Sequence, residues 1–167
     1  QAIQTGQGLE GTVEFFPEEG KYHFDGHRKC GISLSPVEAE RLGGICPVCG
    51  KKLTMGVDHR VEQLADREEG FVKEDGKKYE SLVPLPEVIS ACMGYSTASK
   101  KVQGCFEQML QTLGTEFDIL RNVPSEDIKS CAGERIAEGI ENVRTGNVKR
   151  IPGYDGEYGK IQLFDEN

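Results

Sequence analysis

The sequence predicts an α+β fold in which a small N-terminal β module is followed by an α-helical domain with a short β tail. Short β-prone runs and paired cysteines occupy the first part, and apolar residues at helical spacing occupy the second. Two further β-like runs lie near the end of the chain. The hydrophobic content of 37% is low for one well-packed domain, so two small cores are expected.

The expected organisation has five parts. The chain starts with QAIQTGQG and without an initiator Met, so it reads as a piece cut from a longer protein. We expect a linker remnant at 1–10, the β module at 11–70, a linker at 71–82, the helical domain at 83–150 and the β-like tail at 151–167.

The β module is expected to begin with a hairpin. TVEFFPEEGKYHF has two β-prone runs, at 12–16 and 21–24, and PEEG supplies a turn in which Gly20 is available for positive φ. Ser35 and Pro36 then have the residue types preferred at the N-cap and first position of a helix, which a glycine pair ends. HRVEQLADR adds a short helix, and the charged EEGFVKEDGKKYES is expected to be a loop or linker.

The second part contains helices whose ends are marked by proline, serine and glycine. Pro86 opens the first helix and Gly94 ends it, and Ser96 or Thr97 caps the next, which stops at Gly114. EFDILRNV is a short apolar stretch, PSEDIKS a short helix and GERIAEGIENVR a longer one. Two apolar stripes fall at helical spacing: Val102, Phe106, Met109, Leu110 and Leu113, then Ile136, Ile140 and Val143.

Four candidate metal ligands occur at the spacing of two facing knuckles. They are His27, Cys30, Cys46 and Cys49, in the order His-x2-Cys-x15-Cys-x2-Cys, with a glycine directly after each knuckle. Thiolates and imidazole suit tetrahedral zinc, and four ligands close its coordination shell. The sequence therefore predicts a structural zinc in a zinc-ribbon-like module and no catalytic residue. Catalytic zinc would need an open position, and a redox CxxC would need a helix N-terminus after it.

Other interpretations of these residues remain open. CPVCG could be a stray CxxC, with His27 an ordinary surface residue. His23 or His59 could supply the fourth ligand instead, although a histidine on a strand or helix surface is the more common case. The remaining cysteines lie singly in helical patterns, which is typical of buried cysteines and fits a reducing cytoplasm. The sequence contains no signal peptide or membrane span.

Candidate DNA contacts are few because the net charge is −8, spread evenly as −4 in residues 1–80 and −4 in residues 81–167. A purely electrostatic nucleic-acid binder is excluded, and any DNA contact must be local. The pairs Lys100–Lys101 and Lys149–Arg150 could touch phosphates or could form a solvated face. The two tyrosines of GYDGEYG, Tyr154 and Tyr158, could stack on bases or could be packed turn residues.

AGERIAEGIENVRTG resembles the second half of a helix-hairpin-helix motif. In that motif a glycine turn, here at Gly133 with Arg135 close by, offers backbone N–H groups to a phosphate. The first half is less faithful, because SCAG lacks the usual Gly-x-Gly. A plain helical packing unit remains an equal alternative.

Three stretches together resemble a known family. EGTVEFFPEEGKYHFDGHRKCG, GGICPVCGKKLTMGVDHRVEQLADR and PGYDGEYGKI are similar to the C-terminal part of PHP-type phosphoesterases grouped with endonuclease Q. The resemblance covers residues 9–164, and PGYDGEYGKI also resembles the C-terminal tail of UvrD-type helicases.

The resemblance implies a DNA-repair role. Proteins of this family cut DNA on the 5′ side of deaminated bases or abasic sites, using metal ions in a PHP domain. By position, the His-Cys quartet matches the zinc module and residues 125–144 match a DNA-contacting helical module. The His and Asp clusters of a PHP domain have no counterpart here, so we expect this chain to be inactive alone and to position DNA for an N-terminal PHP domain. A protein-interaction module and a structural brace are the alternatives.

Overall fold

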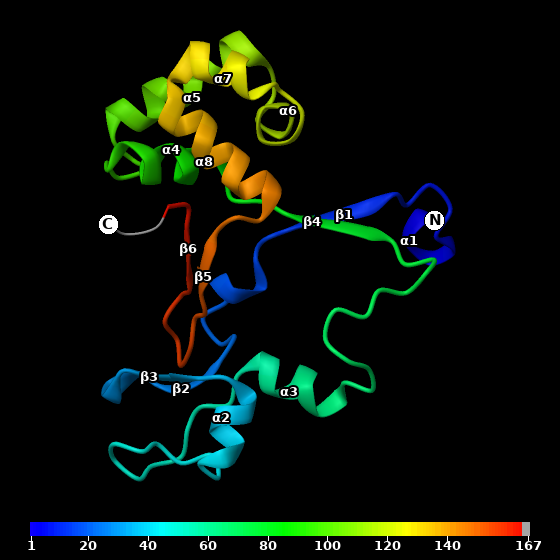
Figure 1. Cartoon of the computed structure of the whole chain (residues 1–167), viewed down its shortest axis with the longest axis vertical. Coiled ribbons are helices and arrows are strands. Elements are labelled where there is room, and N and C mark those ends of the chain that lie inside the picture. The colour runs from blue at the N-terminus through cyan, green and yellow to red at the C-terminus, as the bar shows by residue number, and fades with distance from the viewer. Residues whose placement is uncertain (165–167) are drawn as a thin grey trace. The chain divides into compact units, whose positions relative to one another are not determined.

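A computed structural model describes residues 1–164, which form eight α-helices, two 3-10 helices and six short strands (Figure 1). The predicted α+β class is confirmed. The elements are, in order, α1 (Ala2–Thr5), β1 (Gly11–Glu14), η1 (Pro17–Glu19), β2 (Asp25–His27), η2 (Arg28–Cys30), β3 (Ile32–Leu34), α2 (Pro36–Arg41), α3 (Val57–Leu64), β4 (Lys78–Ser81), α4 (Leu85–Met93), α5 (Lys100–Leu113), α6 (Glu116–Arg121), α7 (Ser125–Ala132), α8 (Glu134–Thr145), β5 (Lys149–Ile151) and β6 (Lys160–Gln162).

The chain divides into two compact units. The first unit contains residues 1–81 and 150–160, and the second unit contains residues 82–149 and the segment from residue 161 onward. The segment predicted as a β-like tail is thus shared between the two units. Within residues 1–164, no helix has the length and apolar character needed to cross a membrane.

The first unit has a very small core. Ala39, Cys46 and Leu53 are buried, with Cys30, Ile32 and Leu34 packed against them. Strands β2 and β3 pair antiparallel beside this cluster. The predicted start of α2 is confirmed, because the Ser35 hydroxyl accepts from the Glu38 N–H while the Glu38 carboxylate accepts from the Ser35 N–H, and Pro36 occupies the first position.

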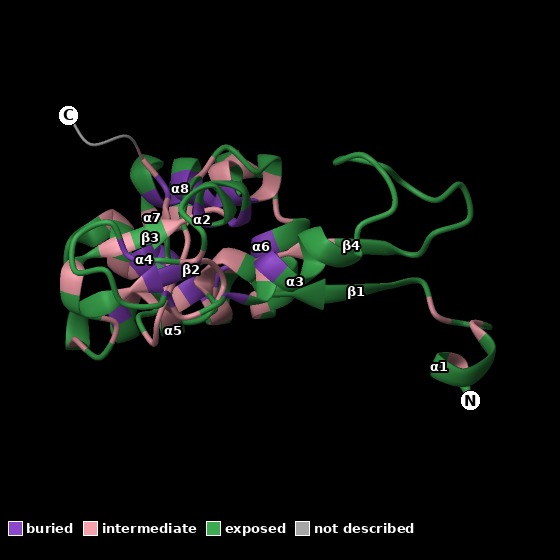
Figure 2. Cartoon of the chain, turned by 90° about the horizontal axis from the view of Figure 1, so that it is seen from below, coloured by how far each residue is buried: buried purple, intermediate pink, exposed green. Residues whose placement is uncertain are grey.

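The predicted hairpin over residues 12–24 is wrong. Strand β1 pairs in parallel with β4, which lies in the segment expected from its charge to be a loop, and both strands are largely exposed (Figure 2). Gly20 has φ −60°, so PEEG does not make the expected turn.

The backbone of residues 18–24 instead pairs with the loop at 153–159. Gly153 N–H donates to the Glu18 carbonyl at 2.8 Å, and Gly159 N–H donates to the Glu19 carbonyl at 3.0 Å. A Cβ on Gly159 would lie 2.0 Å from the Glu18 carbonyl oxygen, so this close approach requires glycine. Because the partner segment is about 130 residues away in the chain, local patterning could not reveal it.

The second unit is built from α4 to α8. The predicted stripe of α8 is buried, whereas in the stripe of α5 only Val102 and Met109 are buried and the other three residues are half-buried. Gly139 of α8 allows close approach to Cys92 and Val88 of α4. Gly94 ends α4 in the left-handed conformation as expected, but α5 is capped by Ser99 and not by Ser96 or Thr97. The apolar stretch EFDILRNV forms α6. The buried core contains Leu85, Val88, Ile89, Val102, Met109, Ile119, Ile128, Ile136, Ile140 and Val143.

Candidate functional site

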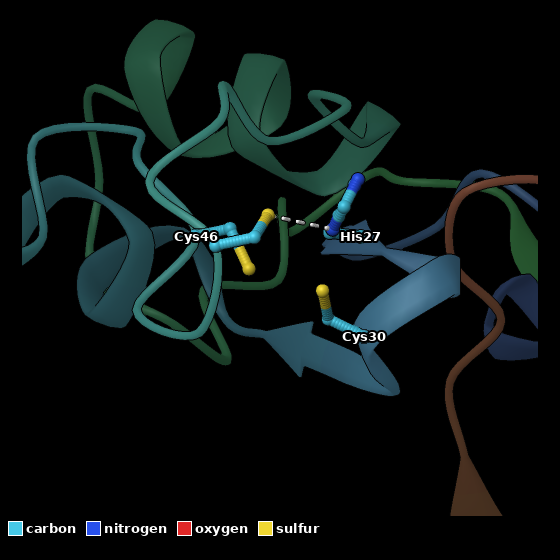
Figure 3. A group of neighbouring side chains, drawn as sticks. His27, Cys30 and Cys46 are labelled. Carbon is cyan, nitrogen blue, oxygen red and sulfur yellow. Dashed lines mark hydrogen bonds between the residues drawn. The ribbon is translucent and has the colours of Figure 1, made fainter.

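The predicted quartet is brought together in the first unit. The ligand-capable atoms of His27, Cys30, Cys46 and Cys49 all lie within 4.8 Å of one another, and the His27 Nδ1 to Cys49 Sγ distance is 3.5 Å. Figure 3 shows the side chains of His27, Cys30 and Cys46 directed toward a common point. His27 ends β2, Cys30 ends η2, and the other two cysteines belong to the CPVCG knuckle.

Glycine shapes both knuckles. Gly31 and Gly50, the residues directly after the last ligand of each knuckle, have φ 65° and 70°, which is the left-handed conformation that favours glycine. Gly50 N–H donates to the Cys46 carbonyl at 2.9 Å and closes the second turn. This tight turn directs the side chains of Cys46 and Cys49 to the same side.

The thiols have unequal proton affinities. Burial, and then hydrogen bonds with Cys49 and Cys46, raise the pKa of Cys30 to about 11. Burial also opposes ionisation of Cys46, but hydrogen bonds from the backbone N–H groups of Cys49 and Val48, together with side-chain hydrogen bonds with Cys49 and His27, lower the Cys46 pKa to about 7. One thiol of the cluster is therefore prepared for thiolate formation by its hydrogen bonds, whereas Cys30 needs a cation to ionise near neutral pH.

The donor set fits zinc. Zn–S bonds of about 2.3 Å and Zn–N bonds of about 2.0 Å in a tetrahedron place ligand atoms roughly 3.5 to 3.8 Å apart. The 3.5 Å separation of His27 Nδ1 and Cys49 Sγ agrees with that geometry, and the remaining pairs lie within 4.8 Å. The cluster could thus hold a metal ion with its own four side chains and no open position.

The alternative fourth ligands lie elsewhere. His59 was expected on a helix surface, but it is 7% exposed and its Nδ1 lies 2.6 Å from Asp25 Oδ2. Asp25 is fully buried and also accepts from the Gly56 N–H at 2.5 Å. His23 stacks on the neighbouring Phe24 ring. Sequence reasoning missed the Asp25–His59 pair, because its members are 34 residues apart and match no ligand spacing.

Two of the candidate DNA contacts line one cavity of the second unit. This cavity of about 480 Å³ is polar, and two cations, Arg135 and Lys149, line it together with one carboxylate, that of Glu138, and the amides of Asn142 and Asn147. The Arg135 guanidinium carbon lies 3.8 Å from the centroid of the Phe164 ring. We call this cavity the basic groove.

The other candidates of the second unit are placed differently. Lys100 begins α5, and Lys101 Nζ donates to the Tyr95 hydroxyl at 2.6 Å while lying 4.1 Å from the centroid of that ring. Gly133 separates α7 from α8 with φ 94°, and its N–H donates to the Lys129 carbonyl at 3.0 Å. The Gly133 N–H therefore already has a hydrogen-bond acceptor within the α7–α8 pair.

The start of α8 also carries an ion pair. Lys129 Nζ lies 2.6 Å from the carboxylate of Glu134, which is the first residue of α8. A carboxylate at this position disfavours an incoming phosphate. The contacts of Gly133 and Glu134 favour a plain helical packing unit. The phosphate-binding helix-hairpin-helix stays a prediction.

Arg150 and the tail tyrosines belong to the first unit. Arg150 pairs with Glu18 at 3.2 Å and covers the Phe16 ring. Tyr154 packs against Gly26 as a turn residue, where a Cβ would lie 2.4 Å from its ring. Tyr158 is 73% exposed.

Asp155 in the same loop was not identified from the sequence. It adopts φ 43°, and its carboxylate accepts from the Thr54 hydroxyl at 2.6 Å and the Arg28 N–H at 2.7 Å. These two hydrogen bonds lower the pKa of Asp155. Because Arg28 follows the candidate ligand His27, this carboxylate fixes the tail loop to the first knuckle.

Comparison with known sequences gives three matches. Residues 84–147 match the family model described as the MJ0043 C-terminal domain. The chain is 34% identical over 149 residues to the uncharacterized protein MJ0043 of Methanocaldococcus jannaschii, covering 88% of this chain and 18% of that protein. It is 29% identical over 147 residues to the uncharacterized protein YqxK of Bacillus subtilis, covering 87% of this chain and 34% of that protein.

Comparison with solved structures is more informative about function. The lesion-specific endonuclease PfuEndoQ from Pyrococcus furiosus superposes with a TM-score of 0.79 at 32% identity, covering 90% of this chain and 37% of that one. Endonuclease Q in complex with a 27-mer duplex substrate, with an abasic lesion at the active site, gives a TM-score of 0.76 at 31% identity over 92% of this chain and 38% of that one. This chain is similar to a part of endonuclease Q. It spans less than two fifths of the length of either structure, and the likeness of its tail to UvrD-type helicases stays a prediction.

Proposed function

We propose that this chain is a DNA-contacting accessory region of a PHP-family DNA-repair endonuclease that cleaves 5′ of deaminated bases. The supporting observation is the similarity to endonuclease Q over at least 90% of the chain, since one of those structures is a complex with duplex DNA. In this proposal the catalytic metal ions belong to the PHP domain of the longer protein, and the residues of this chain hold and orient the duplex.

The metal cluster has a structural role in this proposal. Zinc bound by three thiolates and one imidazole would join the β2–η2 knuckle to the CPVCG knuckle beside a hydrophobic cluster of three buried residues. The bound ion would supply folding energy and no Lewis-acid chemistry, because its shell would be filled by side chains. The six cysteines are free of disulfides within residues 1–164, which is compatible with the cytoplasm as the proposed location.

The basic groove is the proposed phosphate-contacting surface of the second unit. Arg135 and Lys149 lie at one cavity, so a single phosphate or two adjacent ones could meet both cations. Phe164 holds the Arg135 guanidinium from its ring face, which limits its conformational freedom. Lys100 and Lys101 at the start of α5 are a second candidate contact.

A titration with duplex DNA tests the proposal. The full chain is mixed with a labelled duplex carrying a uracil, at two salt concentrations, and binding is followed by anisotropy. We expect Arg135→Gln and Lys149→Gln each to weaken binding and to reduce the salt slope by about one counterion. Lys73→Gln, an exposed lysine paired with Asp75, is the matched control and should bind as the unmodified chain does. Absence of duplex binding at low salt would overturn the proposal.

A protein-interaction module is the second candidate function, and one surface favours it. Val57, Val61 and Leu64 of α3 are between 58% and 64% exposed and lie at positions i, i+4 and i+7. An apolar stripe on an exposed helix face is typical of a protein contact. If duplex DNA does not bind while Val61→Asp abolishes an association of the longer protein, this second function replaces the first.

A further inference from the structure

The first unit contains a second cavity that includes none of the candidate metal ligands. Its volume is about 420 Å³, in the range of small-molecule sites. Its lining is mostly apolar and aromatic. The lining residues are Phe15, Phe16, Pro17, Glu19, Gly20 and Tyr158. We call it the aromatic groove.

Two aromatic rings of this groove remain in contact with water. Phe15 is 68% exposed and Tyr158 is 73% exposed, whereas Phe16 is only 4% exposed. Large rings at the wall of a hollow offer flat π-faces that gain from being covered. The groove therefore has a buried aromatic residue in its lining and two uncovered rings.

Backbone hydrogen bonds hold the two segments of the groove together. Gly153 N–H donates to the Glu18 carbonyl, and Gly159 N–H donates to the Glu19 carbonyl, on either side of the loop that carries Tyr158. Closely approached glycines maintain this contact, as a Cβ on Gly153 would lie 2.5 Å from the Gly20 carbonyl oxygen. The position of Tyr158 relative to residues 18–20 is thus set by the fold.

Positively charged side chains lie close to the aromatic rings of this region. Lys21 Nζ lies 5.7 Å from the ring centroids of both Tyr22 and Tyr158. Arg150 neutralises Glu18, so that carboxylate does not leave an unbalanced negative charge beside the groove. Glu19 does line the groove, and a phosphate is therefore expected on the side of Lys21.

We propose that the aromatic groove binds an unpaired nucleobase of a single-stranded DNA segment. Phe15 and Tyr158 stack on the base, and Lys21 contacts a neighbouring phosphate. Interleaved aromatic rings and lysines are the combination that recognises single strands without sequence preference, because every base has a π-face. The inference rests on the proposed function, since a repair endonuclease opens the duplex at its lesion.

A fluorescent single strand tests the inference. The full chain is titrated with a short oligonucleotide that contains 2-aminopurine, whose emission falls when it stacks on an aromatic ring. Each of Phe15→Leu and Tyr158→Leu should weaken binding about 5- to 100-fold and restore emission. Tyr158→Phe keeps the ring and should bind as the unmodified chain does, and Lys21→Gln should lower the salt slope by about one counterion.

Matched variants separate base stacking from simple apolar contact. Phe117→Leu removes an aromatic ring that is 56% exposed on α6 and should leave binding unchanged. Equal single-strand binding by the leucine variants would overturn the inference and favour an apolar side chain of a protein partner as occupant. Loss of single-strand binding in Tyr158→Phe would also overturn the inference, because this variant keeps the ring that is proposed to stack on the base. If duplex DNA binds but the single strand does not, the inference fails and the proposed function stands; if neither binds, both fail.

Discussion

At the scale of single residues, Asp25 and His59 form a buried polar pair next to the candidate metal ligand His27. Asp25 is fully buried and is held by the His59 ring and the Gly56 N–H. A buried carboxyl group that loses one of its partners keeps its desolvation cost without compensation. The pair therefore connects α3 to β2, the strand that ends at His27.

Replacement of His59 tests the contribution of this pair. His59→Ala should lower the free energy of unfolding of the first unit by about 2–4 kcal/mol, because Asp25 keeps a single hydrogen-bond donor. The measurement is hydrogen exchange at the amides of α3 and β2. Arg60→Ala is the control on the same helix, since Arg60 is exposed and contacts the Gln63 side chain. Equal losses of protection in the two variants would contradict a special role for the pair.

Residue types and spacing were enough to find the candidate metal ligands but not this pair. Two Cys-like knuckles with a glycine after each are a local pattern, and local geometry then brings the four side chains together. Asp25 matches no motif in the sequence and His59 was considered only as an alternative metal ligand, and only the packing of α3 on β2 makes them partners. The same holds for Asp155, whose acceptor role depends on a loop about 100 residues beyond Thr54.

At the scale of secondary-structure elements, a cap within a few residues made two helix ends predictable, although the N-cap of α5 is Ser99 and not the predicted Ser96 or Thr97. The Ser35–Glu38 capping box and the stop at Gly94 follow from side-chain and backbone chemistry inside one turn. The C-terminus of α6 depends instead on α8. Arg144 donates to the carbonyls of Leu120, Ile119 and Val123 at 2.9, 2.7 and 2.7 Å.

Replacement of Arg144 tests this tertiary cap. Arg144→Lys keeps the charge but cannot reach three carbonyls with one ammonium group, so we expect the second unit to lose about 2–3 kcal/mol of unfolding free energy. Urea unfolding followed by far-ultraviolet circular dichroism measures the loss. Gln111→Lys, at an exposed position of α5, serves as the control and should cost under about 0.5 kcal/mol. A loss of that small size for Arg144→Lys would show that α6 does not need the cap.

At the scale of the whole molecule, the two units have cores of very different size. The second unit buries eleven large apolar side chains from α4 to α8, whereas the first unit buries Phe16 and a cluster of three residues beside the candidate metal ligands. The sequence predicted two small cores from its low hydrophobic content. It could not predict the pairing of residues 18–24 with the tail, because that pairing consists of backbone hydrogen bonds and glycine contacts that leave no hydrophobic pattern.

Metal removal should therefore affect the two units unequally. A cluster of three buried residues offers little hydrophobic stabilisation, and in small zinc modules the metal supplies on the order of 10 kcal/mol of folding free energy. We expect elemental analysis to find about one zinc per chain. Chelation, or Cys46→Ser, should then abolish hydrogen-exchange protection across β2, β3 and α2 while α4 to α8 stay protected. Cys105→Ser, in α5 and outside the cluster, should keep both metal and protection. Retained protection in β2 and β3 after complete removal of the metal would mean that the knuckles fold without it. The four ligands would then be held together by the short β2–β3 ladder and by the hydrogen bonds of Asp155.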